Sequence, residues 1–334
     1  MPIPPRELPP ELDVAFTCAD ALRAGATRAR LRARDLAAPF RGTRSRLQPT
    51  AAPDDEPYAR VRAQRERVRL LARAYATVMP ARAFFAGRTA AVLYGAPLDH
   101  GEELEVAELT PGRAPRASGV AGRTVAPALA SIRTLDGLPV ASPASTWAML
   151  ARALTTRELI HVGDALVLIP RDDRGRLQHH RQLTTIDELF AAAHAPGRRG
   201  RPALLAALDD IRVGAMSPLE TDFRVDARHA GLPDPDLDFE VRSDGGLLLG
   251  IADAAYPAYR VLVEVEGDHH RVDRDQWHRD VDKHAAYATH GWEPIRLTAR
   301  HIRGRASTAS AIVADALTRH GWQHGGRLWS AHSL

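Results

Sequence analysis

The sequence predicts a mixed α/β fold, and three observations support this. Segments with alternating apolar side chains, typical of strands, intersperse with stretches whose apolar residues recur at helical spacing. An arginine-rich segment with helix-capping residues stands near the N-terminus, and the order helix, three strands, helix, strand and helix stands near the C-terminus. A chain of 334 residues with 45% hydrophobic content can bury two or three cores. We expect domains over residues 14–47, 58–212 and 213–322.

Composition excludes several classes of protein. The single cysteine, Cys18, allows neither an intrachain disulfide framework nor a cysteine-based zinc site. No apolar run reaches the roughly 18 to 20 residues that cross a bilayer, and the first residues lack the order of a signal peptide. We therefore expect a cytoplasmic protein with no membrane partner.

The first module is expected to be a winged helix-turn-helix. Thr17 can cap a short helix that ends near Arg23, Gly25 supplies a turn, and Thr27 can cap a second helix over residues 28–35. Residues 38–44 contain a proline, a glycine and cationic side chains, which is typical of a wing or tight hairpin that touches phosphates.

This module is also where basic charge gathers. The net charge of the whole chain is only +4, but residues 21–47 hold eight arginines against one aspartate, a net charge of +7. We expect DNA phosphates to contact the arginines at Arg28, Arg30, Arg32, Arg34, Arg41 and Arg44. The alternative is a pair of arginine-rich helices that merely faces solvent.

The middle region is predicted to be mixed α/β. Residues 48–58 have the composition of a linker, and a long helix follows over about 58–78, with Val61, Val68, Leu71 and Tyr75 on its apolar face. Further helices are expected from Gly87, after the Ser-Pro pair at 142–143, over 155–168 and, after a basic turn, within 197–212, with strands at 104–109 and 123–127.

The predicted chemistry lies in the C-terminal region. In the strand over 261–266, Leu262, Glu264 and Glu266 share one face, because side chains alternate along a strand. Two carboxylates on a buried face repel each other unless a cation or a solvent-filled cleft compensates them. Asp253 lies near the end of the preceding strand and can converge on Glu264 if the two strands pair as a hairpin. Oxygen ligands without thiols suit Mg²⁺ or Mn²⁺.

The same region resembles the PD-(D/E)XK nuclease superfamily, and more closely its very-short-patch-repair-like endonucleases. The matching text is SPLE, GLPDPDLDFEV, GIADAAYP, VLVEVEGDHH, WHRDVDK and GWEPIRLT, in the order of that family. The resemblance implies a restriction-endonuclease-like fold, a central mixed sheet flanked by helices. It also implies that Asp253 and Glu264 are metal ligands and that Glu266 stands at the position where the superfamily commonly has lysine.

A glutamate at position 266 must act as a further metal ligand or as a general base, because it cannot supply the charge of lysine. Lys283, the single lysine of the chain, could supply that cation from the next helix, or it could be an ordinary surface residue. Glu220 matches a family acid, but Ser217-Pro218-Leu219-Glu220 is also a capping box. His270 matches a common family histidine, or is a polar strand end.

The N-terminal and middle regions resemble, more loosely, the abortive-infection type IV antitoxin family. The matching segments are FTCADALRAGATRARLRARDLAAPFRGTR and AGRTAAVLYGAPL. This resemblance implies DNA binding, autoregulation of a defence operon and a partner protein from that operon.

The combined prediction is a metal-dependent endonuclease that hydrolyses phosphodiester bonds of DNA. Asp253, Glu264 and Glu266 would hold Mg²⁺, with Glu220, Lys283 and His270 beside them. The alternative is a non-catalytic DNA-binding regulator or antitoxin whose nuclease-like domain is a scaffold. Sequence does not separate DNA from RNA as the substrate.

Overall fold

The computed structural model describes residues 7–46, 59–266, 283–305 and 307–323. The chain forms two compact units. The first holds residues 1–166 and 183–209, and the second holds residues 167–182 and 210–334. Short strands and helices mix in both units, so the predicted α/β class is confirmed. No helix in the described ranges is long and apolar enough to span a membrane.

The N-terminal part of the first unit contains a two-stranded antiparallel sheet and one short helix. Its elements are β1 (Ala15–Thr17), α1 (Cys18–Arg23), the 3₁₀ helix η1 (Arg30–Arg32) and β2 (Thr43–Ser45). Thr17 caps α1 by accepting the Asp20 N–H at 3.0 Å, as its sequence position predicts. The tight turn expected before β2 is present, since Thr43 N–H donates to Phe40 O at 3.1 Å.

The expected second helix over residues 28–35 does not form, and this prediction is wrong. Thr27 does accept the Arg30 N–H at 3.1 Å, but only the single 3₁₀ turn η1 follows. Leu31 is the one residue of the turn that enters the small cluster of Phe16 and Ala21. Arg30 folds back onto Asp35, five residues on, a spacing that an α-helix does not bring together. A segment this short and this polar has too little apolar face to sustain a helix.

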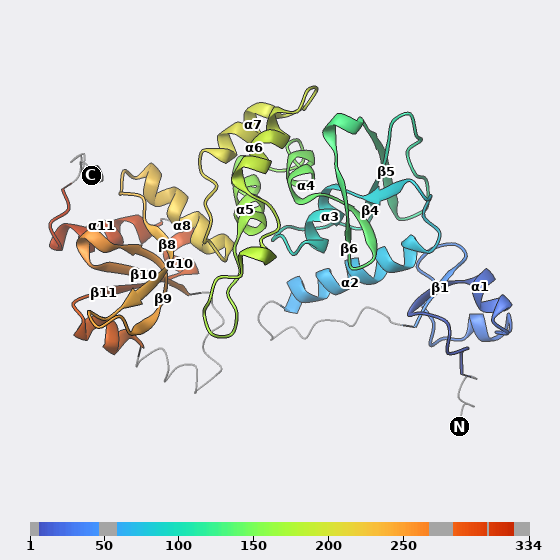
Figure 1. Ribbon diagram of the computed structural model, residues 1–334, viewed down its shortest axis with the longest axis horizontal. Coiled ribbons are helices and arrows are strands. Elements are labelled where there is room, and N and C mark those ends of the chain that lie inside the picture. Colours follow the sequence, from blue (N-terminus) through green and yellow to red (C-terminus); the bar gives the residue numbers. More distant parts are fainter. Residues whose placement is uncertain (1–6, 47–58, 267–282, 306, 324–334) are drawn as a thin grey trace. The chain divides into compact units, whose positions relative to one another are not determined.

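The rest of the first unit is a five-stranded mixed sheet covered by helices, in the strand order β5-β4-β3-β7-β6 (Figure 1). The elements are α2 (Ala59–Ala76), β3 (Ala83–Phe85), α3 (Gly87–Leu93), β4 (Leu104–Leu109), β5 (Val120–Val125), β6 (Ile132–Leu135), β7 (Leu138–Ala141), α4 (Pro143–Met149), α5 (Thr156–Val167), α6 (Ile186–His194) and α7 (Arg201–Leu208).

The core of this sheet agrees with most of the predicted helix face. Val68 and Tyr75 of α2 are buried against Phe85 and Val106 of the sheet. Val61 was expected on the same face but is 40% exposed, because it stands in the first turn of α2, before that core begins. The predicted linker over residues 48–58 lies outside the described residues.

The second unit has a four-stranded sheet in the order β11-β10-β9-β8 (Figure 1). Its elements are α8 (Pro218–His229), β8 (Asp236–Arg242), β9 (Leu248–Tyr256), β10 (Val261–Glu266), β11 (Glu293–Thr298), α10 (Ala299–Arg303) and α11 (Ala309–Arg319), with a helix over the described residues 283–289. β8, β9 and β10 form an antiparallel meander, and β11 adds in parallel to β10. The predicted meander and mixed sheet are therefore present.

Alternation along β10 separates two cores. Val261 and Val263 pack with Phe223 of α8 and Val313 of α11 on one face of the sheet. Leu262 packs with Tyr287 and other residues on the opposite face. Glu264 and Glu266 follow Leu262 by alternation, so the acidic residues of β10 belong to the face of Tyr287 and Lys283.

Candidate functional site

The acidic site lies where β9 and β10 separate. Paired residues of the antiparallel ladder run from Val261 opposite Tyr256 to Val263 opposite Ala254. At the next position the carboxylate of Asp253, through Oδ2, accepts the Val265 N–H at 2.6 Å. This bond fixes the Asp253 carboxylate beside the backbone of β10, next to Glu264. Asp253 therefore contacts the acidic strand through the Val265 N–H, and its convergence on the Glu264 carboxylate stays a prediction.

Glu220 joins this site from α8. Its backbone N–H donates to Ser217 Oγ at 3.2 Å, so Ser217 caps α8 as predicted. Its carboxylate accepts the Met216 N–H at 2.7 Å, whereas a capping box would have it accept the Ser217 N–H. The side chain is buried. Burial first, and the charge of Asp253 second, raise the pKa of Glu220 from 4.5 to about 8. Glu220 is thus part of the start of α8 and an electrostatic neighbour of Asp253, and its catalytic role stays a prediction.

Lys283 contacts the acidic strand directly. Its Nζ lies 2.9 Å from Glu264 Oε1, with the side chains of Lys283 and Glu264 only 25% and 12% exposed. Nζ also donates to Ile251 O of β9 at 3.3 Å, and it stands 5.6 Å from the ring centre of Tyr287. The single lysine is therefore not a solvated surface residue but a cation held at the site.

Tyr287 packs on the same face of the sheet as Lys283 and Glu264. The sequence analysis did not identify it. Burial raises the pKa of its hydroxyl, and the charges of Glu264 and Asp253 raise it further. A Cβ at Gly250 would stand 2.3 Å from the Tyr287 hydroxyl oxygen, so only glycine leaves room for it. The spacing of four residues between Lys283 and Tyr287 on a helix was the available signal, because it places both side chains on one face.

Glu266 lies on the same face of β10 as Glu264 but pairs with a different cation. It forms an ion pair with Arg296 of the neighbouring strand β11. Within the described residues, no three His, Cys, Asp or Glu side chains lie close enough to hold a metal ion. The proposed Mg²⁺ ligands Asp253, Glu264 and Glu266 stay a prediction, and Glu220 is a further carboxylate whose pKa is raised by the charge of Asp253. His270 lies outside the described residues.

A second buried acid, Asp238, adjoins the site and was also missed. Its backbone has φ 50°, and its charge contributes to the raised pKa of Glu220. Arg171 binds it through Nε, 2.8 Å from each carboxylate oxygen, and binds Glu240 at 2.9 Å. Both the Arg171 and the Asp238 side chains are about one-tenth exposed. The segment 167–182 therefore belongs to the second unit, and its distance in sequence from β8 concealed this pairing.

The predicted DNA-contacting arginines separate into two groups. Arg44 is part of the fold, because its Nε donates to Leu31 O at 2.6 Å and its Nη1 to Thr43 O at 2.7 Å. Arg30 is held against Asp35 with its side chain only 9% exposed. The remaining four arginines are exposed on the surface: Arg28, Arg32, Arg34 and Arg41.

Comparison with known proteins gives relatives without an assigned activity. Two proteins of Mycobacterium tuberculosis, Uncharacterized protein MT2308 and Uncharacterized protein Rv2248, are each 26% identical to this chain over 232 residues, which is 69% of this chain and 80% of each relative. No family model matches the chain. The crystal structure of RV2827C protein from Mycobacterium tuberculosis is 19% identical and covers 69% of this chain and 79% of that chain, at a TM-score of 0.34.

Proposed function

We propose that the second unit is a divalent-metal-dependent endonuclease site and that the first unit supplies affinity for DNA. The observation that carries this proposal is the burial of Glu220 beside Asp253, which raises the pKa of Glu220 to about 8. Burying the Glu220 carboxylate next to a second, partly buried acid costs free energy, and the contact with Met216 alone does not require the second acid. A hard divalent cation would remove that cost.

The donor atoms are of the type that such a cation prefers, and in the described residues the carboxylates would have to move together to hold it. Glu220, Asp253 and Glu264 offer carboxylate oxygens, which Mg²⁺ and Mn²⁺ prefer. When bound, the metal would supply a water of lowered pKa and a positive charge near the phosphate. Asp253 is held in place by the Val265 N–H, and Lys283 stands at Glu264 as a further cation. The Val265 N–H would thus fix the Asp253 carboxylate, and Lys283 would place positive charge beside a phosphodiester.

A non-catalytic regulator is the second candidate, and one observation favours it. Glu264 and Glu266 each form an ion pair with a basic residue of the same unit, Lys283 and Arg296. Such pairs can neutralise the acidic face without any metal. In that case the exposed arginines of the first unit would bind DNA, and the second unit would only support the fold.

Cleavage by the Glu264→Gln variant tests the proposal. The full chain should nick plasmid DNA with Mg²⁺ or Mn²⁺, and EDTA should stop it. Glu264→Gln should eliminate cleavage while the protein stays folded, because a neutral amide is a poor ligand for a hard cation. Asp244→Asn, in the exposed turn between β8 and β9, is the matched control and should cut normally.

Metal binding gives a readout that does not depend on activity. Mg²⁺ should raise the melting temperature of the wild type more than that of Glu264→Gln, because a ligand stabilises only a folded state that binds it. If calorimetry shows no divalent metal binding to the wild type even with DNA present, the regulator takes the place of the nuclease.

A further inference from the structure

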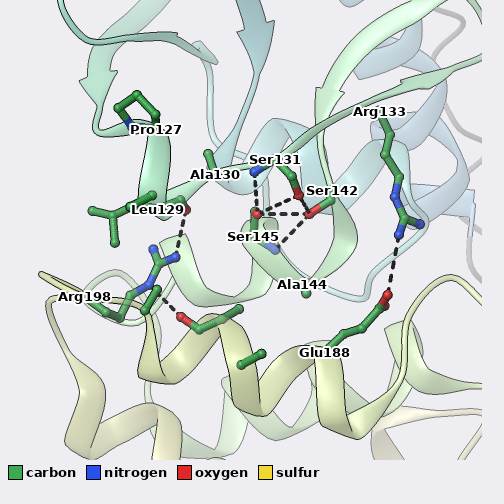
Figure 2. Close-up of a pocket in the computed structure, with 14 residues that line it drawn as sticks. Pro127, Leu129, Ala130, Ser131, Arg133, Ser142, Ala144, Ser145, Glu188 and Arg198 are labelled. Atoms are coloured by element: carbon green, nitrogen blue, oxygen red, sulfur yellow. Dashed lines mark hydrogen bonds and ion pairs between the residues drawn. The ribbon is translucent and has the colours of Figure 1, made fainter.

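A separate cavity of about 340 Å³ lies in the first unit (Figure 2). It is bounded by the segment that leads into β6, by the start of α4, and by α6 with the turn after it. This volume is within the range of small-molecule sites in proteins. Its polar lining residues are Ser131, Arg133, Ser142, Ser145, Glu188 and Arg198. None of the residues that line this cavity belongs to the acidic site of the second unit.

A chain of serine hydroxyls forms the polar wall. Ser131 Oγ donates to Ser142 Oγ at 2.7 Å, and Ser142 Oγ donates to Ser145 Oγ at 2.9 Å. Ser142 also caps α4 by accepting the Ser145 N–H at 3.3 Å, but the cap requires neither of the other two hydroxyls. Hydrogen bonds in such a chain polarise one another, so the last hydroxyl, Ser145, becomes the strongest donor.

The Ser145 hydroxyl has its hydrogen to spare. Its oxygen already accepts from Ser142 and from the Ser131 N–H at 3.0 Å. Within the described chain, the acceptor recorded for its hydrogen is Ser131 Oγ at 3.5 Å, too long for a good O–H···O bond. Ser145 is only 7% exposed, so bulk solvent does not readily satisfy it. An oxygen atom of a ligand in the cavity would accept the hydrogen bond that the Ser145 hydroxyl can donate.

Arg198 brings positive charge to one side of the cavity. Its Nε donates to Ala192 O at 3.0 Å and its Nη2 to Leu129 O at 2.8 Å. In the described structure these neutral carbonyls are its recorded partners, and burial lowers the pKa of Arg198. A guanidinium has five N–H donors, so three remain after these two bonds. A partly buried cation whose recorded partners are carbonyl dipoles gains stability from an anion.

The opposite side of the cavity carries a weaker pair. Figure 2 shows Arg133 and Glu188 facing Arg198 across the serines. The Arg133 and Glu188 charges are 3.7 Å apart, and both side chains are about half exposed. An exposed pair at this distance contributes little stability, so Arg133 can turn toward a ligand at small cost. Apolar side chains, among them Pro127 and Leu129, complete the lining.

We propose that this cavity binds a small organic anion, a carboxylate or a phosphate monoester, whose oxyanion accepts from Ser145 and is neutralised by Arg198. The apolar part of the ligand lies against Pro127, Leu129 and the alanines of α6. This site is independent of the nuclease proposal, because all of its residues belong to the first unit.

Calorimetry on the full chain tests this site with four probes: phenyl phosphate, benzoate, inorganic phosphate and neutral benzyl alcohol. At least one of the two organic anions should bind saturably with a Kd of about 1 mM or lower, and benzyl alcohol should bind at least about ten-fold more weakly. Comparison of phenyl phosphate with benzoate separates the two ligand classes. Inorganic phosphate should bind more weakly than phenyl phosphate, since it lacks the apolar part.

Variants assign the binding to this cavity. Ser145→Ala should weaken binding of the anion about ten-fold, and Arg198→Gln by at least as much, because hydrogen bonds to charged groups are the stronger ones. Arg198→Lys keeps the charge and should retain most of the affinity. Arg82→Gln, an exposed arginine outside the cavity, should bind as the wild type does.

The Ser145→Ala variant keeps the test decisive if Arg198→Gln fails to fold. Absence of binding by both organic anions overturns the proposal. So does equal binding of benzyl alcohol, or an affinity that Ser145→Ala leaves unchanged in a protein with a normal thermal unfolding transition. In the last case the anion binds to surface arginines elsewhere.

Discussion

Lys283 Nζ and Glu264 Oε1 lie 2.9 Å apart, so the single lysine of the chain is the counter-charge of Glu264. The proposed metal would bind to the same carboxylate. A cation that must displace or share Glu264 with Lys283 binds more weakly than it would to a free carboxylate. The ion pair between Lys283 and Glu264 therefore lowers the affinity of the site for the metal.

Lys283→Gln should separate two effects of this lysine: it stabilises the fold through its ion pair with Glu264, and it competes with the metal for that carboxylate. Loss of the pair should lower the free energy of unfolding in EDTA by about 1 to 3 kcal/mol, because Glu264 stays partly buried without its partner. Mg²⁺ affinity should rise a few-fold, measured by calorimetry, since no cation competes for Glu264. If Lys283 also acts on the phosphate, cleavage should fall despite the tighter metal. Unchanged stability and unchanged Mg²⁺ affinity would contradict the pairing.

Glu220 should make stability depend on pH. The pKa of Glu220 in the folded protein is about 8, above the ordinary value of 4.5. Its protonated form therefore stabilises the fold fully below about pH 4.5, and this contribution is lost as pH rises through 8. In EDTA, Glu220→Gln cannot titrate and should be more stable than the wild type by about 2 to 4 kcal/mol at pH 8, with the gap closing by pH 5.

Urea unfolding at several pH values measures this difference, with Glu102→Gln on the surface as the control. Mg²⁺ should reduce the difference in the free energy of unfolding between the wild type and Glu220→Gln at pH 8, since a bound cation favours the charged form of Glu220. Glu220→Ala should be less stable than Glu220→Gln at every pH, because alanine leaves the Met216 N–H without its acceptor. Parallel curves for wild type and Glu220→Gln would refute the raised pKa.

Arg171 should be essential to the stability of the second unit. Arg171→Gln leaves Asp238 buried without its guanidinium partner, and breaking such a pair costs about 3 kcal/mol or more. Arg174→Gln, on the exposed turn of the same segment, should change stability by less than about 0.5 kcal/mol. Chemical denaturation of both variants gives the comparison. Equal stability of the two would show that the segment 167–182 is not held by this ion pair.

The exposed arginines should account for the salt dependence of DNA binding. Replacing Arg28, Arg32 and Arg41 together with glutamine should weaken binding to any duplex and reduce the salt slope, log Kobs against log[salt], by about 2 to 3. Arg44→Gln should instead lower the melting temperature, because its hydrogen bonds to Leu31 and Thr43 hold the turn. Fluorescence anisotropy at several salt concentrations measures the slope. If the triple variant keeps the wild-type slope, this surface does not contact phosphates.

Sequence patterns predicted the second unit well because its signals are local. Alternation alone placed Glu264 and Leu262 on one face of β10, and the capping box placed the start of α8 at Pro218. The Asp253 contact to β10 also followed from pairing neighbouring strands. These features depend on residues that lie close together along the chain.

The remaining features depend on contacts between distant residues. Arg171 precedes Asp238 by 67 positions, and no local pattern indicates their pairing. The failure of the second helix near Arg30 has a related cause. Capping and charge favoured a helix there, but only Leu31 of η1 finds a buried apolar neighbour, and tertiary packing decides whether so short a segment is helical. The serine cavity likewise joins Ser131 to Ser145 across β6 and β7.

A protease that cuts only after lysine has a single target bond within this chain, between Lys283 and His284. The ammonium group that such a protease must recognise is the one bound to Glu264 and to the Ile251 carbonyl. Cutting therefore requires Lys283 to leave the acidic strand, and its rate reports how often the ion pair opens. A ligand that takes Glu264 from Lys283 would speed the cut, and the two resulting fragments would show it on a gel.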